Sequence, residues 1–491
     1  MKTKALMILG TGSSVGKSLI VAGLLRYFAS KGIKCAPFKS QNMSLNSVVI
    51  KSGHEIARAQ VAQAFAAKTE PSVFMNPILL KPLGDATSEL IVMGQPVGHF
   101  KISEYYKMKT KLLTTIIDAF NELTKLYDLI ILEGAGSPAE INLMSHDLAN
   151  TLLLKELKVP ALLIGDIDKG GIFASFYGTL ALLNEDIKTL IKGFVINKFR
   201  GDKEILKPGL KMIYELSKVP VIGVVPYLTN TAFDSEDSLS NEDMFLRQKL
   251  PLNDCLKVSV IKTPKISNVS DFDPLIFEHS LSVNLTSSLD LAFQSDLIII
   301  PGSKATVSDL NWLKLNKIES WLNDYKKSEK VLMGICGGYQ MLGKEIIGDF
   351  ESKSQWQAGL GLLDHITVFT NKKTLAYRVG KAKGEKLTGY EIRYGLSQQN
   401  SAPWIELEDQ EASEGNHRDN CYGTAIHGIF DSDEFRRVFL KEIADQNKKV
   451  FEANKISFFE AKNNELNYLA QVIASCCEIN FIEDLIMEAS L

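Results

Sequence analysis

The first half of the chain alternates short apolar runs with longer stretches in which apolar residues recur at helical spacing. The expected strands span residues 5–9, 34–37, 129–132, 161–164, 193–196 and 221–225. The expected helices include residues 18–30, 55–67 and 105–126. This alternation is typical of a parallel sheet with helices on both faces, so we predict a doubly wound α/β domain.

A polar, acid-rich stretch over residues 234–251 interrupts this pattern, and we place a domain boundary there. A second alternation follows, with expected strands at 257–261, 297–300 and 331–334 and expected helices at 306–315 and 337–345. Residues 360–426 are richer in β-type residues, and the remainder is helical in pattern. The prediction is two α/β domains, residues 1–250 and 251–491, the second with a core to about residue 440 and a helical C-terminal segment.

The composition and charge of the chain argue against several classes of protein. The 491 residues carry a formal net charge of −3, which indicates no basic surface for nucleic acid or a membrane. No apolar run is long enough to span a bilayer, and the apolar start is expected to be a strand because a glycine-rich loop follows it at once. The six cysteines form no C-x-x-C pair, so we expect no disulfide framework, no zinc site and a cytoplasmic protein.

The stretch GTGSSVGKS, between the first strand and the first helix, has the context of a phosphate-binding loop. Its backbone N–H groups and the helix N-terminus favour phosphate, Lys17 would reach the outer phosphates of ATP, and the Ser18 hydroxyl would bind Mg²⁺. The expected nucleotide contacts are Gly10, Thr11, Gly12, Gly16, Lys17 and Ser18. Gly10 stands one position earlier than in the strict motif. A glycine turn without a ligand is the alternative.

Two polar residues after later strands extend this prediction. Glu133 ends an apolar strand at the edge where ligands of parallel sheets bind, so it is expected to hold or orient Mg²⁺, with a solvated strand end as the alternative. Asn197 follows another strand and could read an adenine edge, or could be an ordinary turn residue. Many partitioning and motor ATPases carry an extra lysine at the place of Gly12. Its absence here favours a synthetase.

A second chemical centre is expected around Cys336, in the stretch GICGGYQMLG. A strand, one turn residue and a helix between small residues form the plan of a nucleophile elbow, where the helix N-terminus lowers the pKa of a thiol. The N–H of Gly337 and a donor from the loop at Gly302 would form an oxyanion hole. His427 is the candidate base. The alternatives are a packed cysteine and a structural histidine.

These motifs resemble known families. The elbow, the PGSKAT loop and the late histidine resemble class I glutamine amidotransferases, and the phosphate loop resembles dethiobiotin synthetase-like ATPases. Fused in this order, the two resemble the cobyrinic and cobyric acid synthases of cobalamin biosynthesis. Further stretches favour the cobyric acid branch, namely residues 39–44 (KSQNMS), 58–60, 75–77, 133–137, 166–168, 197–202 and 266–268.

The resemblance implies a reaction. The second domain would hydrolyse glutamine through a thioester on Cys336, with His427 as acid and base. Ammonia would pass to the first domain, where ATP would activate the b, d, e and g carboxylates of adenosylcobyrinic a,c-diamide, a corrinoid, for amidation. Polar residues of the first domain are candidates for contacts to the corrin carboxylates, with ordinary surface or loop residues as the alternative: Lys39, Gln41, Asn42, Arg58 and Lys81.

Two positions depart from the patterns that the resemblance brings. Many class I amidotransferases place a glutamate two residues after the catalytic histidine, where this chain has Ile429. The stretch usually read as GYEIH ends in Arg393. The rival hypotheses are another amidating synthetase, such as one for the cobyrinic a,c-diamide step, and a partitioning-type nucleotide switch.

Overall fold

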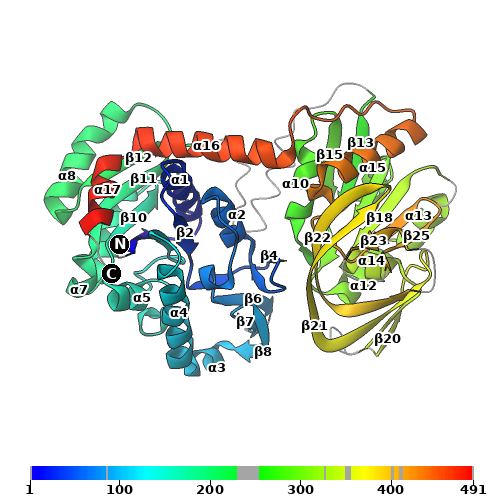
Figure 1. Ribbon diagram of the computed structural model, residues 1–491, viewed down its shortest axis with the longest axis horizontal. Coiled ribbons are helices and arrows are strands. Elements are labelled where there is room, and N and C mark those ends of the chain that lie inside the picture. The colour runs from blue at the N-terminus through cyan, green and yellow to red at the C-terminus, as the bar shows by residue number, and fades with distance from the viewer. Residues whose placement is uncertain are drawn as a thin grey trace. The chain divides into compact units, whose positions relative to one another are not determined.

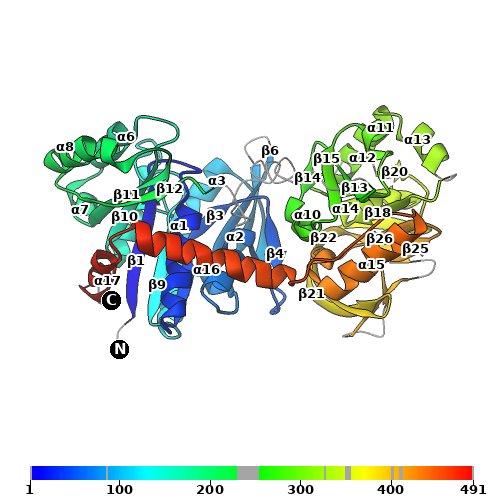
Figure 2. The same ribbon diagram turned by 90° about the horizontal axis from the view of Figure 1, so that it is seen from above.

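The computed structural model describes residues 3–84, 87–228, 254–325, 328–348, 355–399, 403–408 and 413–488. The chain forms two compact units, which Figures 1 and 2 show from two directions. The first unit comprises Met1–Ser44, Glu55–Glu236 and Lys462–Leu491, and the second comprises Leu45–His54 and Asp237–Ala461. The expected boundary at residue 250 lies outside the described residues. The division differs from the expected one because residues 45–54 belong to the second unit and residues 462–491 belong to the first.

The first unit is built on a six-stranded sheet of order β12-β11-β10-β1-β9-β2, in which every neighbouring pair is parallel. Its strands are β1 (Lys4–Gly10), β2 (Cys35–Phe38), β9 (Leu129–Glu133), β10 (Ala161–Asp166), β11 (Ile191–Phe199) and β12 (Val221–Pro226). All six strands match apolar runs predicted from the sequence, which confirms the parallel α/β fold of this unit.

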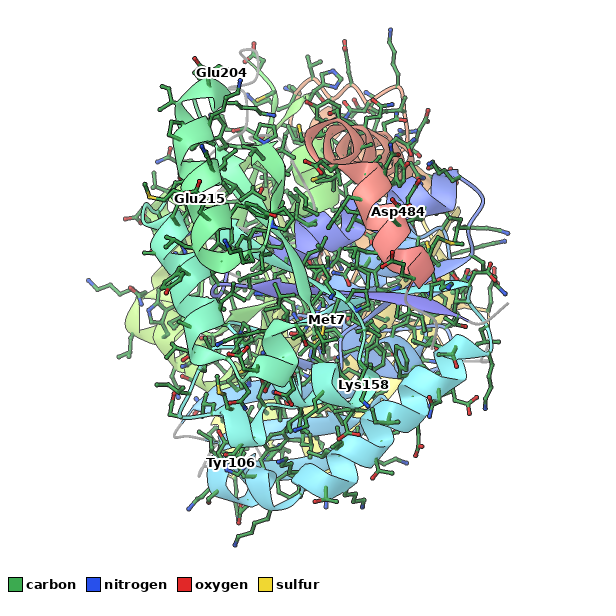
Figure 3. All side chains as sticks on the ribbon, turned by 90° about the vertical axis from the view of Figure 1, so that its left-hand side faces the viewer. Met7, Tyr106, Lys158, Glu204, Glu215 and Asp484 are labelled. Carbon is green, nitrogen blue, oxygen red and sulfur yellow. The ribbon has the colours of Figure 1, made fainter. Side chains whose placement is uncertain are left out.

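Side chains of β1 alternate between two apolar cores, one on each face of the sheet. Met7 lies in one core and Ile8 in the other, and both are fully buried, whereas Lys158 and Glu204, labelled with Met7 in Figure 3, are exposed. The helices that contribute to the first core include α4 (Lys109–Thr124), α5 (Thr151–Leu157), α6 (Ile172–Leu182) and α8 (Lys207–Ser217). The second core is formed with α1 (Lys17–Ser30), α16 (Phe458–Cys476) and α17 (Ile479–Glu488).

The C-terminal helices belong to the first unit, where α16 packs closely against α1. A Cβ at Gly23 would lie 2.6 Å from Cγ1 of Ile473, so the glycine lets α16 pack directly onto α1. Leu469 and Ile473 are almost fully buried there. The expectation that residues 251–491 form one domain is therefore wrong for the last thirty residues.

Between β2 and α4 the first unit carries a smaller antiparallel-rich sheet that the sequence pattern did not predict. Its strands, in the order β3-β6-β7-β8, are β3 (Gln41–Met43), β6 (Ile78–Gly84), β7 (Thr87–Val92) and β8 (Gln95–Lys101). The first three residues of the helix expected at 55–67 form the strand β5 (Glu55–Ala57), and the helix itself, α2, spans Arg58–Ala66. The helix expected at 105–126 is divided into α3 (Ile102–Lys107) and α4.

The second unit contains a six-stranded sheet of order β15-β13-β16-β18-β26-β25, parallel except for its last pair. Its strands are β13 (Leu256–Ile261), β15 (Leu281–Thr286), β16 (Leu297–Ile300), β18 (Val331–Ile335), β25 (Asn416–Arg418) and β26 (Cys421–Thr424). The helices around it include α10 (Asp273–Phe277), α11 (Leu289–Ala292), α12 (Thr306–Leu315), α13 (Ile318–Tyr325), α14 (Gly337–Leu342) and α15 (Asp433–Gln446). The second α/β domain is thus confirmed.

A further sheet of the second unit follows the order β20-β19-β21-β23-β24, and the long hairpin β21–β22 extends from it. Its strands are β19 (Glu345–Ile347), β20 (Trp356–Ala358), β21 (His365–Ala382), β22 (Glu385–Gln399), β23 (Ile405–Leu407) and β24 (Ser413–Glu414). This region agrees with the prediction of a β-rich stretch over residues 360–426. Among the described residues, no helix combines the length and apolarity needed to cross a bilayer.

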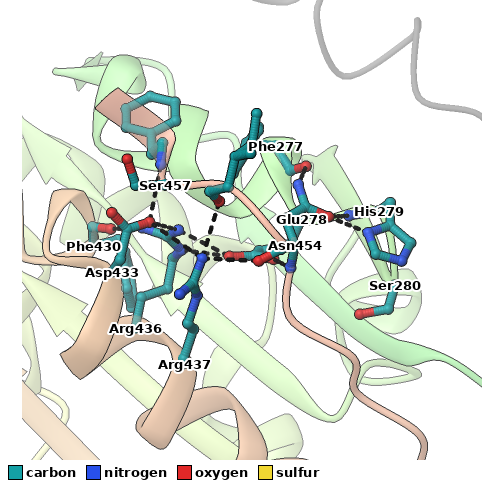
Figure 4. A network of polar contacts seen from close by, with 12 residues as sticks. Phe277, Glu278, His279, Ser280, Phe430, Asp433, Arg436, Arg437, Asn454 and Ser457 are labelled. Carbon is teal, nitrogen blue, oxygen red and sulfur yellow. Dashed lines mark hydrogen bonds and ion pairs between the residues drawn. The ribbon is translucent and has the colours of Figure 1, made fainter. Parts of the chain in front are cut away.

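A buried polar network attaches the segment before α16 to the second unit (Figure 4). Arg436 is fully buried and donates to Oε1 of Glu278, with Nη2 at 2.8 Å, and to Oδ1 of Asp433. The same two carboxylates accept from the backbone N–H groups of Asn454 at 2.8 Å and Phe458 at 3.0 Å. One arginine therefore aligns two acids that together hold the start of α16.

Candidate active sites

Cys336 lies between β18 and α14 with φ 50° and ψ −106°, a backbone conformation that is unfavourable for a residue with a side chain. The glycines around it make this turn possible. A Cβ at Gly334 would lie 2.7 Å from the backbone carbon of Gly338, and one at Gly338 would clash with the carbonyl oxygen of Ile300. The side chain of Cys336 is 7% exposed, at the N-terminus of α14. The local sequence thus builds the predicted elbow.

His427 lies beside the elbow, and a carboxylate holds it from behind. Its Nδ1 lies 2.6 Å from Oδ2 of Asp271, whose Oδ1 accepts from the N–H of Gly428 at 3.2 Å. Burial by itself would lower the pKa of His427, but Asp271 and a hydrogen bond with Cys336 outweigh it and raise the pKa to about 10. With Nδ1 occupied by Asp271, Nε2 is the nitrogen available to exchange a proton with the thiol.

Asp271 is the functional residue that sequence reasoning missed. It lies in the 3-10 helix η4 (Val269–Phe272), 156 positions before His427. The position where many related domains carry the acid is Ile429, which is fully buried in the apolar core. A signal was present, because Asp271 comes three residues after the stretch at residues 266–268 that supported the resemblance, but nothing in the sequence joined that stretch to His427.

Gly302 and Gly337, the two residues predicted for the oxyanion hole, both lie at the elbow around Cys336. A Cβ at Gly302 would lie 2.9 Å from Cε1 of His427, and a Cβ at Gly337 would lie 2.8 Å from the backbone nitrogen of Ser303. The strand β17 (Gly302–Ser303) is therefore packed directly against the elbow. A side chain at either position would clash with the residues around the elbow, so glycine is favoured at both, and the two residues stay predictions for the oxyanion hole.

Arg393, the second departure from the expected pattern, belongs to a charge cluster around the buried Glu391 on the hairpin β21–β22. Its Nε donates to Oε2 of Glu391 at 2.7 Å, and its Nη1 donates to the carbonyl of Gly395 at 2.6 Å. Arg378 donates to the other oxygen of Glu391. Burial would raise the pKa of Glu391, but the two arginines lower it. Arg393 thus stabilises the strand that crosses the elbow.

The phosphate loop of the first unit closes around Lys17. The ammonium of Lys17 donates to the carbonyls of Gly12 at 2.9 Å and Gly136 at 3.0 Å. A Cβ at Gly10 would lie 2.9 Å from this ammonium, so a larger residue at the early position of the motif would displace the Lys17 side chain. The loop therefore places Lys17 at its centre, where terminal phosphate oxygens can replace the carbonyls.

Glu133 is fully buried at the end of β9 and gathers the polar groups around the loop. Its Oε1 accepts from the Ser18 hydroxyl at 2.8 Å and from the Lys39 ammonium at 2.9 Å, and its Oε2 accepts from the amide of Gln63. Burial would raise the pKa of Glu133, but Lys39 and the hydrogen bonds lower it. The carboxylate is therefore ionised, as a Mg²⁺ ligand must be.

The residues present fit a Mg²⁺ ion whose coordination shell is completed by the phosphates of a bound nucleotide. Within the part of the chain that the structure describes, no group of three or more His, Cys, Asp or Glu side chains could hold a metal. The Ser18 hydroxyl and the Glu133 carboxylate are adjacent, at 2.8 Å. Mg²⁺ commonly takes one or two protein ligands and completes its shell with phosphate oxygens and water, so the pair suffices.

Glu133 also sets the direction of a buried chain of amides. A carboxylate can only accept, so Gln63 must turn its NH₂ towards Glu133 and its oxygen towards Gln60. Gln60 in turn accepts from Nδ2 of Asn42 at 2.8 Å. All four side chains are fully buried. The chain ends at Oδ1 of Asn42, which has no partner among the described residues and is the place where a donor is expected.

Asn197 packs against the phosphate loop, and its contact with an adenine edge stays a prediction. Its Nδ2 donates to the carbonyl of Val15 at 2.8 Å, and a Cβ at Gly16 would clash with that amide. The side chain is 2% exposed. Asn197 thus braces the phosphate loop, and Lys198, which sequence reasoning did not single out, donates to the carbonyl of Ser14 at 2.8 Å.

The candidates for corrin contacts fall into two groups. Lys39 and Lys81 are buried in ion pairs, Lys39 with Glu133 and Lys81 with Glu55 at 2.8 Å, so neither presents a free ammonium at an open surface. Gln41, which accepts from the hydroxyl of Tyr105, and Arg58 are both half-buried. All five residues stay predictions for corrin contacts, and the Lys39 ammonium shares Oε1 of Glu133 with the Ser18 hydroxyl of the phosphate loop.

Comparison with protein families supports a nucleotide site in the first unit and a glutamine site in the second. Residues 6–240 match the model of the CobQ/CobB/MinD/ParA nucleotide binding domain, and residues 257–435 match the model of the CobB/CobQ-like glutamine amidotransferase domain. The fold and the two sites therefore define a nucleotide-binding domain joined to a glutamine amidotransferase domain. The predicted fold class is confirmed.

Curated relatives narrow this class. The chain is 43% identical to a cobyric acid synthase of Ruminiclostridium cellulolyticum over 99% of this chain and 97% of that protein. It is 42% identical to those of Clostridium acetobutylicum, over 97% of both chains, and Listeria monocytogenes, over 98% and 96%. The chain belongs to the cobyric acid synthase family, which confirms the resemblance and favours it over the two rival hypotheses.

Proposed function

We propose that this chain amidates the b, d, e and g carboxylates of adenosylcobyrinic a,c-diamide, with glutamine as nitrogen donor and ATP as energy source. Its family membership supports this reaction. The observation that carries the proposal is that one chain holds both a nucleophile elbow with its histidine and carboxylate and a phosphate loop with its own buried carboxylate. Free thiols at all six cysteines are compatible with a cytoplasmic enzyme.

The second unit would release ammonia from glutamine. The Cys336 thiolate attacks the side-chain amide carbon, and the N–H groups near Gly337 and Gly302 stabilise the oxyanion. His427 gives its Nε2 proton to the departing nitrogen, so ammonia leaves and a thioester forms. A water then adds as His427 takes its proton, and glutamate leaves with the thiolate restored. Asp271 stabilises the imidazolium throughout.

The first unit would use ATP to activate a carboxylate. Bound Mg²⁺, held by Ser18 and Glu133, would neutralise charge on the phosphates. Lys17 and Lys39 place two ammonium groups beside the transferred phosphoryl group. The corrin carboxylate attacks the γ-phosphorus, ADP leaves, and an acyl phosphate forms. Ammonia then displaces phosphate to give the amide, which a carboxylate alone would resist because its leaving group is poor.

Product mass tests the whole proposal. The full chain is incubated with ATP, Mg²⁺, glutamine and adenosylcobyrinic a,c-diamide, and the corrinoid is followed by mass spectrometry. Four successive amidations are expected. Glutamine hydrolysis without any change in the corrinoid would overturn the substrate assignment while sparing the amidotransferase.

Replacement of the nucleophile tests the division between the units. Cys336→Ser should abolish the use of glutamine yet retain amidation with ammonium salts, since the first unit receives ammonia directly. Amidation from glutamine in this variant would show that Cys336 is not the nucleophile.

A further inference from the structure

Tyr390 contacts His427 through both backbone and ring. The N–H of Tyr390 donates to the carbonyl of His427 at 3.0 Å, and the N–H of His427 donates to the carbonyl of Tyr390 at 2.8 Å. The two rings stack with centroids 5.4 Å apart and planes 21° apart. Both residues are buried. The imidazole is therefore held at Nδ1 by Asp271 and across its face by Tyr390.

Asn268 holds the outer end of Tyr390. Its Nδ2 donates to the hydroxyl of Tyr390 at 2.8 Å, and its backbone has φ 54° and ψ 43°, a left-handed conformation that asparagine tolerates better than most residues. Its carbonyl accepts from the N–H of Asp271 at 2.9 Å. One short turn thus supplies the carboxylate behind His427 and the amide behind the stacked tyrosine.

The same amide reaches a segment from the first half of the sequence. Nδ2 of Asn268 also donates to the carbonyl of Ser47 at 3.4 Å. Ser47 begins β4 (Ser47–Val49) and is 1% exposed, and residues 45–54 belong to the second unit although their neighbours along the chain belong to the first. The residues directly before this segment are the QNMS stretch, which contains Gln41 and Asn42.

We propose that Asn268 and Tyr390 are positioning residues for His427, and that residues 45–50 control them through the carbonyl of Ser47. An amide nitrogen carries two N–H donors, one for each of these acceptors, so withdrawal of Ser47 loosens Asn268 and frees the tyrosine ring from the imidazole. Because residues 41–44 precede the segment without a break, a ligand that orders them sets the rate of glutamine hydrolysis. The inference rests on the proposed function for the identity of that ligand.

Such control has a chemical purpose. Glutamine hydrolysis without a waiting acyl phosphate wastes the nitrogen. A histidine whose ring is aligned only when the synthetase segment is ordered would restrict hydrolysis to the moment when ammonia can be used. The device requires no movement of Cys336 or Asp271, only of the ring that stacks on His427.

Glutamate release by the full chain tests this inference, measured with glutamine alone and with ATP, Mg²⁺ and adenosylcobyrinic a,c-diamide added. Asn268→Gly deletes the amide and keeps the left-handed backbone free of strain. We expect kcat for glutamine to fall at least tenfold with KM within twofold of wild type, and the stimulation by the added ligands to disappear. Tyr390→Phe, which keeps the ring, should lose about fivefold in kcat, equivalent to one hydrogen bond.

Two further variants separate the segment from the general stability of the unit. Val49→Ala shortens a buried side chain of the segment and leaves the residues His427, Tyr390 and Asn268 themselves unaltered. It should lower only the stimulation by the added ligands. Asn284→Ala, an exposed asparagine on β15, should match wild type.

Three results would overturn the inference. One is wild-type stimulation in Asn268→Gly. Another is a rise in KM with unchanged kcat, which would mean that Asn268 binds glutamine. The third is loss of ammonium-driven amidation in the same variant, which would mean a general loss of structure. If wild type makes no amide from ammonium, the proposed substrate is wrong, and the kcat and KM comparison with glutamine alone still decides the role of Asn268.

Discussion

Nδ1 of His427 lies 2.6 Å from Oδ2 of Asp271, and both side chains are almost completely buried. This pair completes a cysteine–histidine–aspartate arrangement in which the acid comes from a turn before α10 and not from the residues after the histidine. Its partner across the site is Cys336, whose strained backbone is enforced by glycines.

Asp271→Asn should lower kcat for glutamine by about 10- to 1,000-fold, because the amide cannot stabilise the imidazolium. The carboxylate raises the pKa of His427, so the protonated form persists to about pH 10 in wild type and should be lost at lower pH in the variant. The alkaline limb of kcat/KM against pH should move to lower pH. Asp290→Asn, exposed on α11, is the matched control. An unchanged alkaline limb would contradict the assignment.

Glu133→Gln should abolish ATP-dependent amidation, by at least about 100-fold, since it removes the ionised ligand next to Ser18 and leaves the ammonium of Lys39 buried without its partner. The measurement is amidation with ammonium salts over a range of Mg²⁺ concentrations. Glutamine hydrolysis without ATP should remain. Glu156→Gln, exposed on α5, serves as control, and comparable Mg²⁺ curves for the two variants would refute the role of Glu133.

Gln63→Glu tests the direction of the amide chain. The substitution places a second carboxylate against Glu133 in a fully buried site, where one of the two must take up a proton or the site must open. Thermal unfolding at pH 8 should show a loss of about 3 kcal/mol or more. Gln63→Met removes the hydrogen bond without adding charge and should lose less. Equal losses would show that the direction of this amide is unimportant.

Glu414→Gln should stabilise the second unit at alkaline pH. Burial, with the Glu391 charge beside it, raises the pKa of Glu414 to about 7. The folded state therefore holds this proton more tightly than the unfolded chain, and stability falls as pH rises from about 4 towards 7 and levels off above that. Glutamine does not titrate, so the difference in melting temperature between variant and wild type should grow from pH 5 to pH 8. A difference independent of pH would contradict this.

Glu278→Gln should destabilise the second unit by about 3–5 kcal/mol, because the guanidinium of Arg436 stays buried with less compensating charge. The measurement is the urea midpoint. The matched control is Glu329→Gln on the same unit, which should stay within about 0.5 kcal/mol of wild type. Arg436→Met combined with Glu278→Gln should recover part of the loss. An additive double variant would show that the pair is not coupled.

The local sequence was sufficient where the chemistry lies within one stretch. The six strands of the first sheet were all recognisable as apolar runs, and the phosphate loop and the cysteine elbow each combine a strand, a glycine turn and a helix in consecutive residues. The small sheet β3-β6-β7-β8 escaped prediction because proline and glycine interrupt β6 and β8, so neither alternation nor helical spacing stands out there.

By itself, then, the sequence determined the fold class, the two chemical centres and the family resemblance. The tertiary structure decided which distant side chains meet: Asp271 with His427 across 156 positions, Lys39 with Glu133 across 94, and Ser47 with Asn268 across 221. It also assigned residues 45–54 and the last helix to units other than those expected. These outcomes depend on how sheets and helices pack, and a pairing between buried polar groups forms only after the packing has brought them together and excluded water.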